Sequence, residues 1–383
     1  MATPIRFLRG NIRNHLKRSG HNKNYPGVFA METKPWALHL KNLYEEASVR
    51  EISSEDKLVI FSDLHMGNGS KRDVFKKNAA LFLKILKQVY LKNDFHLILN
   101  GDVEELHKFH LHRILNSWHG VYDLFDQFRK RDRLTKIIGN HDRLLMAEQN
   151  YPFADQLMNA IRLQLNDIPF FLFHSDQASD FYIKYNHFSG FLLRYIANPL
   201  YIHPTSVAYH SMRRFLVEKR VYDFSRMHKI ISIIGHTHRP LFESFSKVDF
   251  LKYKIEQLCR DYDHADKGTR QTIEKEISEF KAELQTMLKK RGRKELSSYV
   301  YNADYVLPCV FNSGTVTGRR GITGIEIRDG RIALIHWFDD RKLRKYFKLY
   351  DNQPEEFCGS GCYRMVLKED SLNYIYNRIK LLA

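Results

Sequence analysis

The sequence predicts a layered α/β fold, and two observations carry this prediction. Short apolar runs of strand length recur along the chain, and the first three are separated by stretches of helical period such as 78–91. Strands that alternate with helices are typical of βαβ units packed in layers. Each run is rich in β-branched or aromatic residues and ends in polar residues; the runs span 58–63, 95–102, 134–142, 168–176 and 229–238.

The second observation is a different kind of strand near the end of the chain. Residues 309–317 form another short run, and residues 321–338 alternate in character around Asp329-Gly330. An Asp-Gly pair between alternating residues is the signal of a two-residue β-hairpin turn. We therefore expect the sheets to end in antiparallel strands.

The chain is expected to hold one catalytic domain with two insertions. Its 383 residues allow a large hydrophobic core. Residues 177–228 are aromatic and basic and are interpreted as a lid. Residues 247–296 are charged with helical period, so they form either a solvated helical hairpin or a surface for a protein partner. The predicted boundaries are a basic, irregular lead-in at 1–55, the domain at 56–350 and a C-terminal tail at 351–383.

Charge and composition limit the classes of binding partner and the cellular locations that we expect for the protein. Lys and Arg outnumber Asp and Glu by 61 to 44, a balance that attracts nucleic acid, anionic lipid or phosphorylated substrates without choosing among them. No apolar run reaches the roughly 18 to 20 residues of a membrane span, and the basic N-terminus lacks a secretory apolar stretch. The expected location is the cytoplasm, with peripheral contact at the inner face of a membrane as an alternative. Four cysteines predict no disulfide framework, and the Cys358/Cys362 loop stays without an assigned role.

Polar residues that can bind metal follow each of the five apolar runs. The carboxyl ends of strands in an α/β sheet are where ligands bind, because loops from separate strands converge there. Carboxylates, one carboxamide and several imidazoles suit manganese, iron, cobalt, nickel or zinc better than magnesium or calcium. Any one of these clusters is weak evidence, but five at successive strand ends form a specific signal. They are Asp63 with His65, Asp102, Asn140 with His141 and Asp142, His174, and His236 with His238.

Together these clusters resemble the calcineurin-like metallophosphoesterase superfamily. The resemblance covers residues 57–240 and the late strands at 306–338, and it implies a four-layer αββα sandwich with a metal site at one edge. One departure is Ser175, because many members carry glycine at that position. The matching motifs are SDLH at 62–65, NGDVEE at 100–105, GNHD at 139–142, FHSD at 173–176 and GHTHRP at 235–240.

The resemblance also implies a role for each residue. Two metal ions would neutralise phosphoryl oxygens and activate water, and a bridging carboxylate would fix their spacing. An imidazole beside the leaving oxygen would supply a proton, a role that falls to His141. Asp142 and Glu105 would orient imidazoles, or else they are ordinary surface or helix-start acids. The implied ligands are Asp63, His65 and His238 for one ion, Asn140, His174 and His236 for the other, and Asp102 as the bridge.

The order of parts resembles one branch of the superfamily, the UDP-2,3-diacylglucosamine pyrophosphatases. That branch also places an aromatic, basic lid between the fourth motif and Gly-His-Thr-His-Arg-Pro. It typically has Arg where His141 stands, and it lacks an insertion like 247–296. In the lid, Arg194, Arg213 and Arg214 are expected to contact phosphate or a membrane surface. The aromatic residues there either line an acyl groove or pack the lid itself.

These residues predict a metal-dependent hydrolase of phosphodiester or pyrophosphate bonds. We expect two divalent transition metal ions, manganese first, and an anionic phosphorylated substrate that is lipid-linked or nucleotide-linked. A nuclease stays open because the chain is basic, although no separate nucleic-acid-binding module is visible. A non-catalytic scaffold is the third interpretation, and the complete ligand set argues against it.

Overall fold

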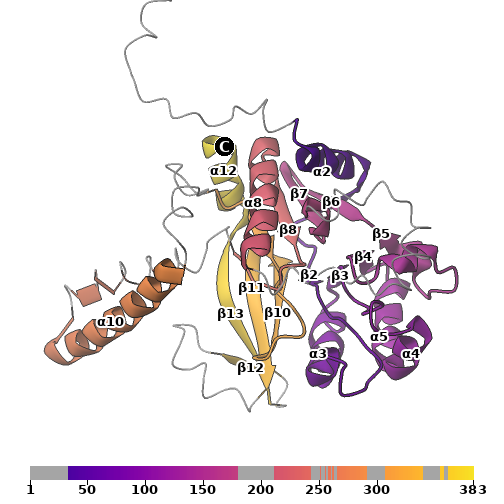
Figure 1. The fold of residues 1–383 in the computed structure, drawn as a ribbon, viewed down its shortest axis with the longest axis horizontal. Helices are drawn as coiled ribbons and strands as arrows, with labels where there is room; N and C mark the ends of the chain where they lie inside the picture. The colour runs from indigo at the N-terminus through magenta and orange to yellow at the C-terminus, as the bar shows by residue number, and fades with distance from the viewer. Residues whose placement is uncertain are drawn as a thin grey trace, which may run out of the picture.

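The computed structural model describes residues 33–179, 211–242, 265–290, 307–339, 354–357 and 361–383, with a few positions between 251 and 262. Two β-sheets form its centre, as Figure 1 shows. The smaller sheet has five strands in the order β1-β6-β7-β8-β9. Their bounds are Ser48–Ile52, Ala160–Leu165, Ile168–Phe173, Ile231–Ile234 and Val310–Asn312.

The larger sheet has eight strands in the order β12-β13-β11-β10-β2-β3-β4-β5. Strands β2, β3, β4 and β5 are parallel, whereas β10 runs antiparallel to β2. The mixed α/β class predicted from the alternating pattern is therefore present. In sheet order the bounds are Glu355–Phe357, Cys362–Ser371, Arg331–Asp339, Ile322–Arg328, Leu58–Phe61, His96–Asn100, Leu134–Ile137 and Leu157–Met158.

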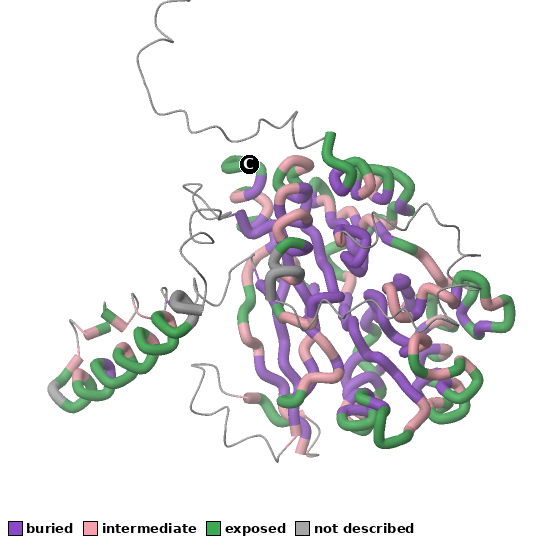
Figure 2. The backbone as a smooth tube through the Cα atoms, in the orientation of Figure 1, coloured by how far each residue is buried: buried purple, intermediate pink, exposed green. Residues whose placement is uncertain are grey.

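The central strands of the larger sheet are buried on both faces, which explains why they are continuously apolar. On β2, Leu58 and Ile60 belong to a core that they share with the smaller sheet, whereas Val59 and Phe61 point into a second core with the helices α3 and α5. Figure 2 shows these strands as the buried centre, with exposed residues gathered on the helices around it. The helices are α2 Pro35–Glu46, α3 Ala79–Ile85, α4 Leu111–Ser117, α5 His119–Lys130, α8 Ser211–His228, α10 Lys267–Lys290 and α12 Leu372–Leu382.

The predicted hairpin is confirmed. Strands β10 and β11 pair antiparallel, with Arg328 opposite Arg331 across the turn. Asp329 and Gly330 both have positive φ, at 52° and 67°, which is the backbone that a tight two-residue turn requires.

Two expectations about the ends of the chain are wrong within the described residues. The segment expected to be irregular up to residue 55 contains α2 and β1, and β1 pairs parallel to β6. The expected C-terminal tail contains β13, which pairs with β11 along its length, and α12, whose Leu372, Ile375 and Ile379 join the core between the sheets. Both segments gain their structure from partners that are distant in sequence.

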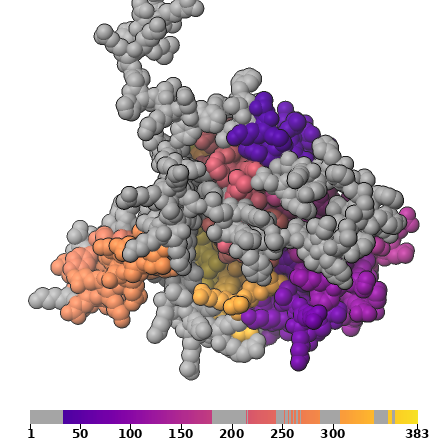
Figure 3. All heavy atoms as spheres, in the orientation of Figure 1, coloured from indigo at the N-terminus to yellow at the C-terminus, as the bar shows by residue number. Residues whose placement is uncertain are grey.

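The two predicted insertions are described only in part. Of the lid, 180–210 lies outside the described residues, and 211–228 forms α8, which packs against β8 and β9. In the second insertion α10 is a helix with mostly exposed side chains that stands apart from the sheets (Figures 1 and 3). None of the described helices is long and apolar enough to cross a bilayer.

A buried polar network ties the C-terminal strand β13 to the larger sheet. The guanidinium of Arg364 donates to Glu326 at 2.5 Å, and the Tyr90 hydroxyl donates to the same carboxylate at 2.9 Å. The indole of Trp337 donates to the Tyr90 hydroxyl at 2.7 Å. Both charged side chains are almost completely buried, and each is the nearest charged partner of the other, ahead of Arg328 for Glu326 and of Glu355 for Arg364.

Replacing Arg364 by Met is expected to lower the free energy of unfolding by about 3–5 kcal/mol, because it leaves the Glu326 charge buried without its partner. Arg331→Met is the control in the same sheet, since its ion pair with Glu369 is half exposed and should contribute about 0–1 kcal/mol. Urea unfolding of both variants measures the difference. Equal small losses would mean that β13 is not part of the cooperative core.

Candidate metal centre

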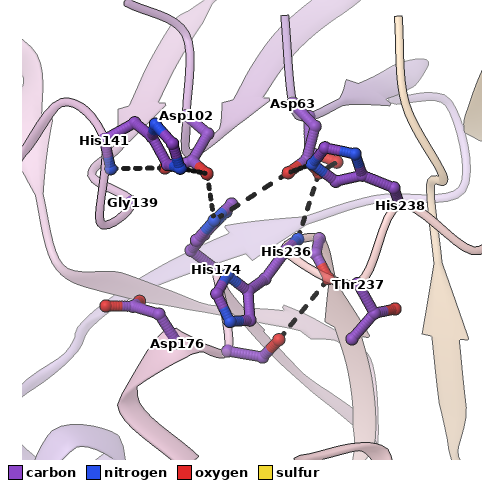
Figure 4. Close-up of polar contacts among 12 residues, drawn as sticks. Asp63, Asp102, Gly139, His141, His174, Asp176, His236, Thr237 and His238 are labelled. Atoms are coloured by element: carbon purple, nitrogen blue, oxygen red, sulfur yellow. Dashed lines mark hydrogen bonds and ion pairs between the residues drawn. The ribbon is translucent and has the colours of Figure 1, made fainter. Parts of the chain in front are cut away.

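Strands from both sheets deliver polar side chains to one place. Asp63 lies two residues after β2, Asp102 two residues after β3, and His174 directly after β7. Figure 4 shows these side chains turned toward one another, with the His174 ring between the two carboxylates. Among the described residues, four sets hold ligand atoms within 4.8 Å of one another, as a metal site requires. Two of them are Asp63, His65 and His238, and Asp102, His174 and His236; the other two contain His141, one with His65 and Asp102 and one with Glu105 and His107.

The backbone at this centre is unusual, because many of these residues have positive φ. Asp63, His65 and Asp102 have φ of 55°, 47° and 54°. His236 and His238 have φ of 64° and 54°. Residues other than glycine rarely adopt this left-handed region, and such strain is concentrated at functional sites. The turns bend the chain sharply where each strand ends.

Two glycines permit close approach of the candidate ligands. A Cβ at Gly101 would stand 2.3 Å from His174 Nδ1, and one at Gly139 would stand 2.2 Å from Asp102 Oδ1. Any larger residue at either position would displace a carboxylate or imidazole of the centre. The glycines of the Gly-Asp and Gly-Asn-His-Asp motifs therefore set the spacing of the side chains.

The two oxygens of Asp63 have separate surroundings. Oδ2 accepts hydrogen bonds from the His236 backbone N–H at 3.0 Å and from the Ser62 hydroxyl at 2.5 Å. Oδ1 lies 2.9 Å from His238 Nε2 and 3.8 Å from His65 Nε2. One oxygen thus anchors the carboxylate to the protein, and the other is turned toward the imidazoles.

Asp102 repeats this division and faces both sets of imidazoles. Its Oδ1 accepts the His141 backbone N–H at 2.8 Å. Its Oδ2 lies 3.1 Å from His174 Nε2 and 3.9 Å from His65 Nε2. Asp102 is consequently the residue that stands between the two groups.

Three imidazoles have an oxygen atom close to their Nδ1, and two of these contacts are hydrogen bonds. His141 Nδ1 lies 2.7 Å from Glu105 Oε1, and His65 Nδ1 lies 3.3 Å from Glu105 Oε2. His174 Nδ1 lies 2.8 Å from the Asn100 carbonyl oxygen, so it is the protonated nitrogen there. In His141 and His174 this acceptor fixes the tautomer and directs Nε2 into the centre, as is usual for metal-ligating histidines, whereas His65 Nδ1 makes no hydrogen bond.

The ligand atoms of the centre suit divalent transition metals, and their lack of hydrogen bonds supports this. Within the described residues, buried ligand atoms of this centre have no hydrogen-bond partner, although burial without one is costly. They combine oxygen with imidazole nitrogen, a mixture typical of manganese, iron or zinc sites. The atoms are Asn140 Oδ1, His236 Nε2, Asp63 Oδ1 and His174 Nε2; the last two make no hydrogen bond although they lie 2.9 Å from His238 Nε2 and 3.1 Å from Asp102 Oδ2.

Burial and neighbouring charges determine which side chains of the centre are charged and which are neutral. Burial opposes ionisation of Asp102, but His174 and His141 outweigh it and hold the pKa of this carboxyl well below its usual value. Burial, and then the neighbouring His174, lowers the pKa of His236 to about 3. Asp102 is therefore charged and His236 neutral near neutral pH, which are the forms that bind metal.

Some predicted residues have other surroundings than expected. Asp142 does not orient an imidazole in the described structure: its carboxylate accepts the backbone N–H groups of Val103 and Gly139, both at 2.7 Å. Arg194 lies outside the described residues, as does the side chain of Arg213, and Arg214 is half-buried on α8.

The segment 104–112 is helical only at its C-terminal end. Helix α4 begins only at Leu111, and Glu104 and Glu105 are buried, with Glu105 against the imidazoles. His110 and His112, further along the segment, are exposed.

Sequence reasoning missed the segment that follows β9. Ser313 lies within hydrogen-bond distance of Ser62, at 2.7 Å, and Thr315 donates to the Asp63 carbonyl at 2.9 Å. The Asn312 amide donates to Thr237 at 2.9 Å. The polar run after the late strand was the signal that could have identified these supports.

Comparison with known proteins adds little. No protein-family model matches the chain, and no curated protein matches its sequence. The matching solved structures include a cold-active protein tyrosine phosphatase at 11% identity and TM-score 0.32, covering 75% of this chain and 78% of that one. Another, from a psychrophilic Shewanella species, has 12% identity and TM-score 0.31, covering 75% and 80%. Scores of this size do not establish a common fold, so the chemistry rests on this chain's own residues.

Ser175 stands where many members of the resembled superfamily carry glycine, and replacing it tests whether the backbone is strained there. Its φ is 82°, a value that glycine adopts without cost. Ser175→Gly is therefore expected to raise the free energy of unfolding by about 1 kcal/mol. Ser175→Ala is the control, because it removes the hydroxyl but keeps the Cβ, and it should not stabilise. Thermal melts of the two variants decide the matter, and a gain shared by alanine would rule out relief of strain.

Proposed function

We propose that the chain is a binuclear metal-dependent phosphoesterase that hydrolyses a phosphodiester or pyrophosphate bond. The single observation that carries the proposal is the convergence of two histidine and carboxylate groups on either side of Asp102, with unsatisfied ligand atoms buried between them. The arrangement of two packed sheets with helices on the larger one supports the four-layer metallophosphoesterase sandwich as the architecture.

The proposed assignment is the one that the resemblance to the metallophosphoesterases implies, and the grouping of the described side chains supports it. Asp63 Oδ1, His65 and His238 would hold one ion, and Asn140, His174 and His236 the other, with Asp102 Oδ2 shared. When bound, the ions supply positive charge for the phosphoryl oxygens and lower the pKa of water. The protein holds the carboxylates through Ser62 and backbone N–H groups, so that their free oxygens do not rotate away.

His141 is proposed to act on the leaving group. Its ring is half-buried at the edge of the centre, with Nε2 3.9 Å from Asp102 Oδ2. Because Glu105 accepts from Nδ1, the opposite nitrogen is the one that can hand a proton to a departing oxygen. The same contact prevents the ring from turning.

The substrate is proposed to be an anionic, lipid-linked or nucleotide-linked phosphate ester or anhydride. The sequence of the lid and its arginines, Arg194, Arg213 and Arg214, supports this proposal. Purified protein with manganese should be assayed on a phosphomonoester, bis-p-nitrophenyl phosphate, a UDP-linked pyrophosphate and single-stranded DNA. Preference for the DNA would favour a nuclease instead, and inactivity on every substrate would favour a scaffold.

Removal of metal is expected to abolish hydrolysis of bis-p-nitrophenyl phosphate, and manganese should restore it. Asp102→Asn should lower kcat/KM by more than the roughly 100-fold typical of residues that only support a ligand, because Asp102 faces both groups. Asp155→Asn, an exposed acid, is the control and should match the wild type. Metal content by mass spectrometry accompanies the assay. Full metal content and activity in Asp102→Asn would refute the shared-ligand assignment.

His141→Ala should retain metal but lose turnover by about 10²–10⁴-fold, the usual contribution of a general acid. The loss should grow along a series of aryl phosphodiesters as the leaving group becomes poorer, since poor leaving groups need the proton most. His112→Ala removes an exposed histidine and serves as the control. A uniform loss across the series, or a lost ion, would assign His141 to metal binding.

A further inference from the structure

Behind the candidate metal centre lies a buried charged cluster that the proposed mechanism does not use. Lys136 on β4 and Glu104 are both completely buried, and their Nζ and Oε2 atoms lie 2.7 Å apart. Lys136 Nζ also lies 3.8 Å from Asp142 Oδ2. Lysine and glutamate are almost never fully buried unless they are paired, and the contact between these two side chains explains why both can be buried.

Two tyrosines complete the surroundings of Glu104. Tyr122 on α5 and Tyr151 both donate their hydroxyl groups to Glu104 Oε1, at 3.0 Å and 2.7 Å. Burial, and then the Glu104 carboxylate, raises the pKa of both phenols, so they stay protonated and keep donating. With Lys136 on the other oxygen, Glu104 has one preferred orientation.

Asp142 connects this cluster to the candidate ligands. Its Oδ2 accepts the N–H of Val103, which follows Asp102, and its Oδ1 accepts the N–H of Gly139, which precedes Asn140. One buried carboxylate therefore joins the backbone beside a proposed bridging ligand to the backbone beside a ligand from the next strand. Glu104 lies on the first of these loops and Lys136 on the strand that leads to the second.

We propose that Lys136, Glu104 and Asp142 form a positioning cluster that sets the Asp102 loop against the Asn140 loop. The inference rests on the proposed function, because it concerns the distance between two sets of metal ligands. Directional hydrogen bonds and charges specify one arrangement of the two loops, whereas apolar packing at the same place would tolerate several. None of the three side chains touches the reacting atoms.

Lys136→Met tests the proposal, because it keeps most of the volume and removes the charge. The probe is manganese alone, followed by calorimetry and by electron paramagnetic resonance, in which a bridged pair of ions gives an exchange-coupled spectrum. The affinity for the second manganese ion should fall at least tenfold, the lower end of what supporting partners contribute. The exchange-coupled signal should be lost while the first ion still binds.

Two further variants separate positioning from stability. Arg364→Met destabilises the same sheet by breaking another buried ion pair, away from this cluster, and it should keep the coupled signal. Glu104→Gln combined with Lys136→Met leaves no unpaired charge at this pair, so it should recover stability while the second ion still binds weakly. If Lys136→Met alone fails to fold, the double variant provides a folded protein without the ion pair, in which manganese binding can still be measured.

The outcomes are distinct. A coupled manganese pair of wild-type affinity in folded Lys136→Met or in the double variant overturns the positioning role. Loss of the coupled signal in Arg364→Met as well would reduce the effect to stability and overturn it too. If the wild-type protein shows no coupled pair, the binuclear function fails, and this inference fails with it.

Discussion

The structure depends on keeping two carboxylates, Asp63 and Asp102, charged in the protein interior. Both are almost completely buried, and an unpaired buried charge is strongly unfavourable. Each therefore has one oxygen fixed by backbone N–H groups or a hydroxyl, while imidazoles surround the other. The left-handed turns and close-packed glycines are the local means by which the strands bring these partners within reach.

Much of this could be predicted from the sequence, because the signals were local. The apolar runs at β2, β3, β4, β7 and β8 were recognisable by length and composition, and each was followed by its polar cluster. The rule that ligands gather at the carboxyl ends of such strands then brought the clusters together. The Asp329-Gly330 turn was likewise encoded in two adjacent residues.

What could not be predicted depends on distant partners. Strand β1 is half exposed and becomes a strand only by pairing with β6, and β13 needs β11. Lys136 looks like a surface residue in its strand, and only the neighbouring Glu104 with its two tyrosines explains why it is buried. Asp142 was assigned to an imidazole because spacing cannot show that two backbone N–H groups reach it first.

The antiparallel pairing of β10 with β2 has a consequence for biosynthesis. Ile60, beside the first cluster of the centre, pairs with Ile325, near the other end of the chain. Until β10 has been synthesised, β2 is an edge strand with unpaired backbone groups and apolar faces, a recognised hazard for aggregation. Contacts of such long sequence separation also slow folding. The edge of β2 therefore stays unpaired on this side until β10 has been synthesised and has folded onto it.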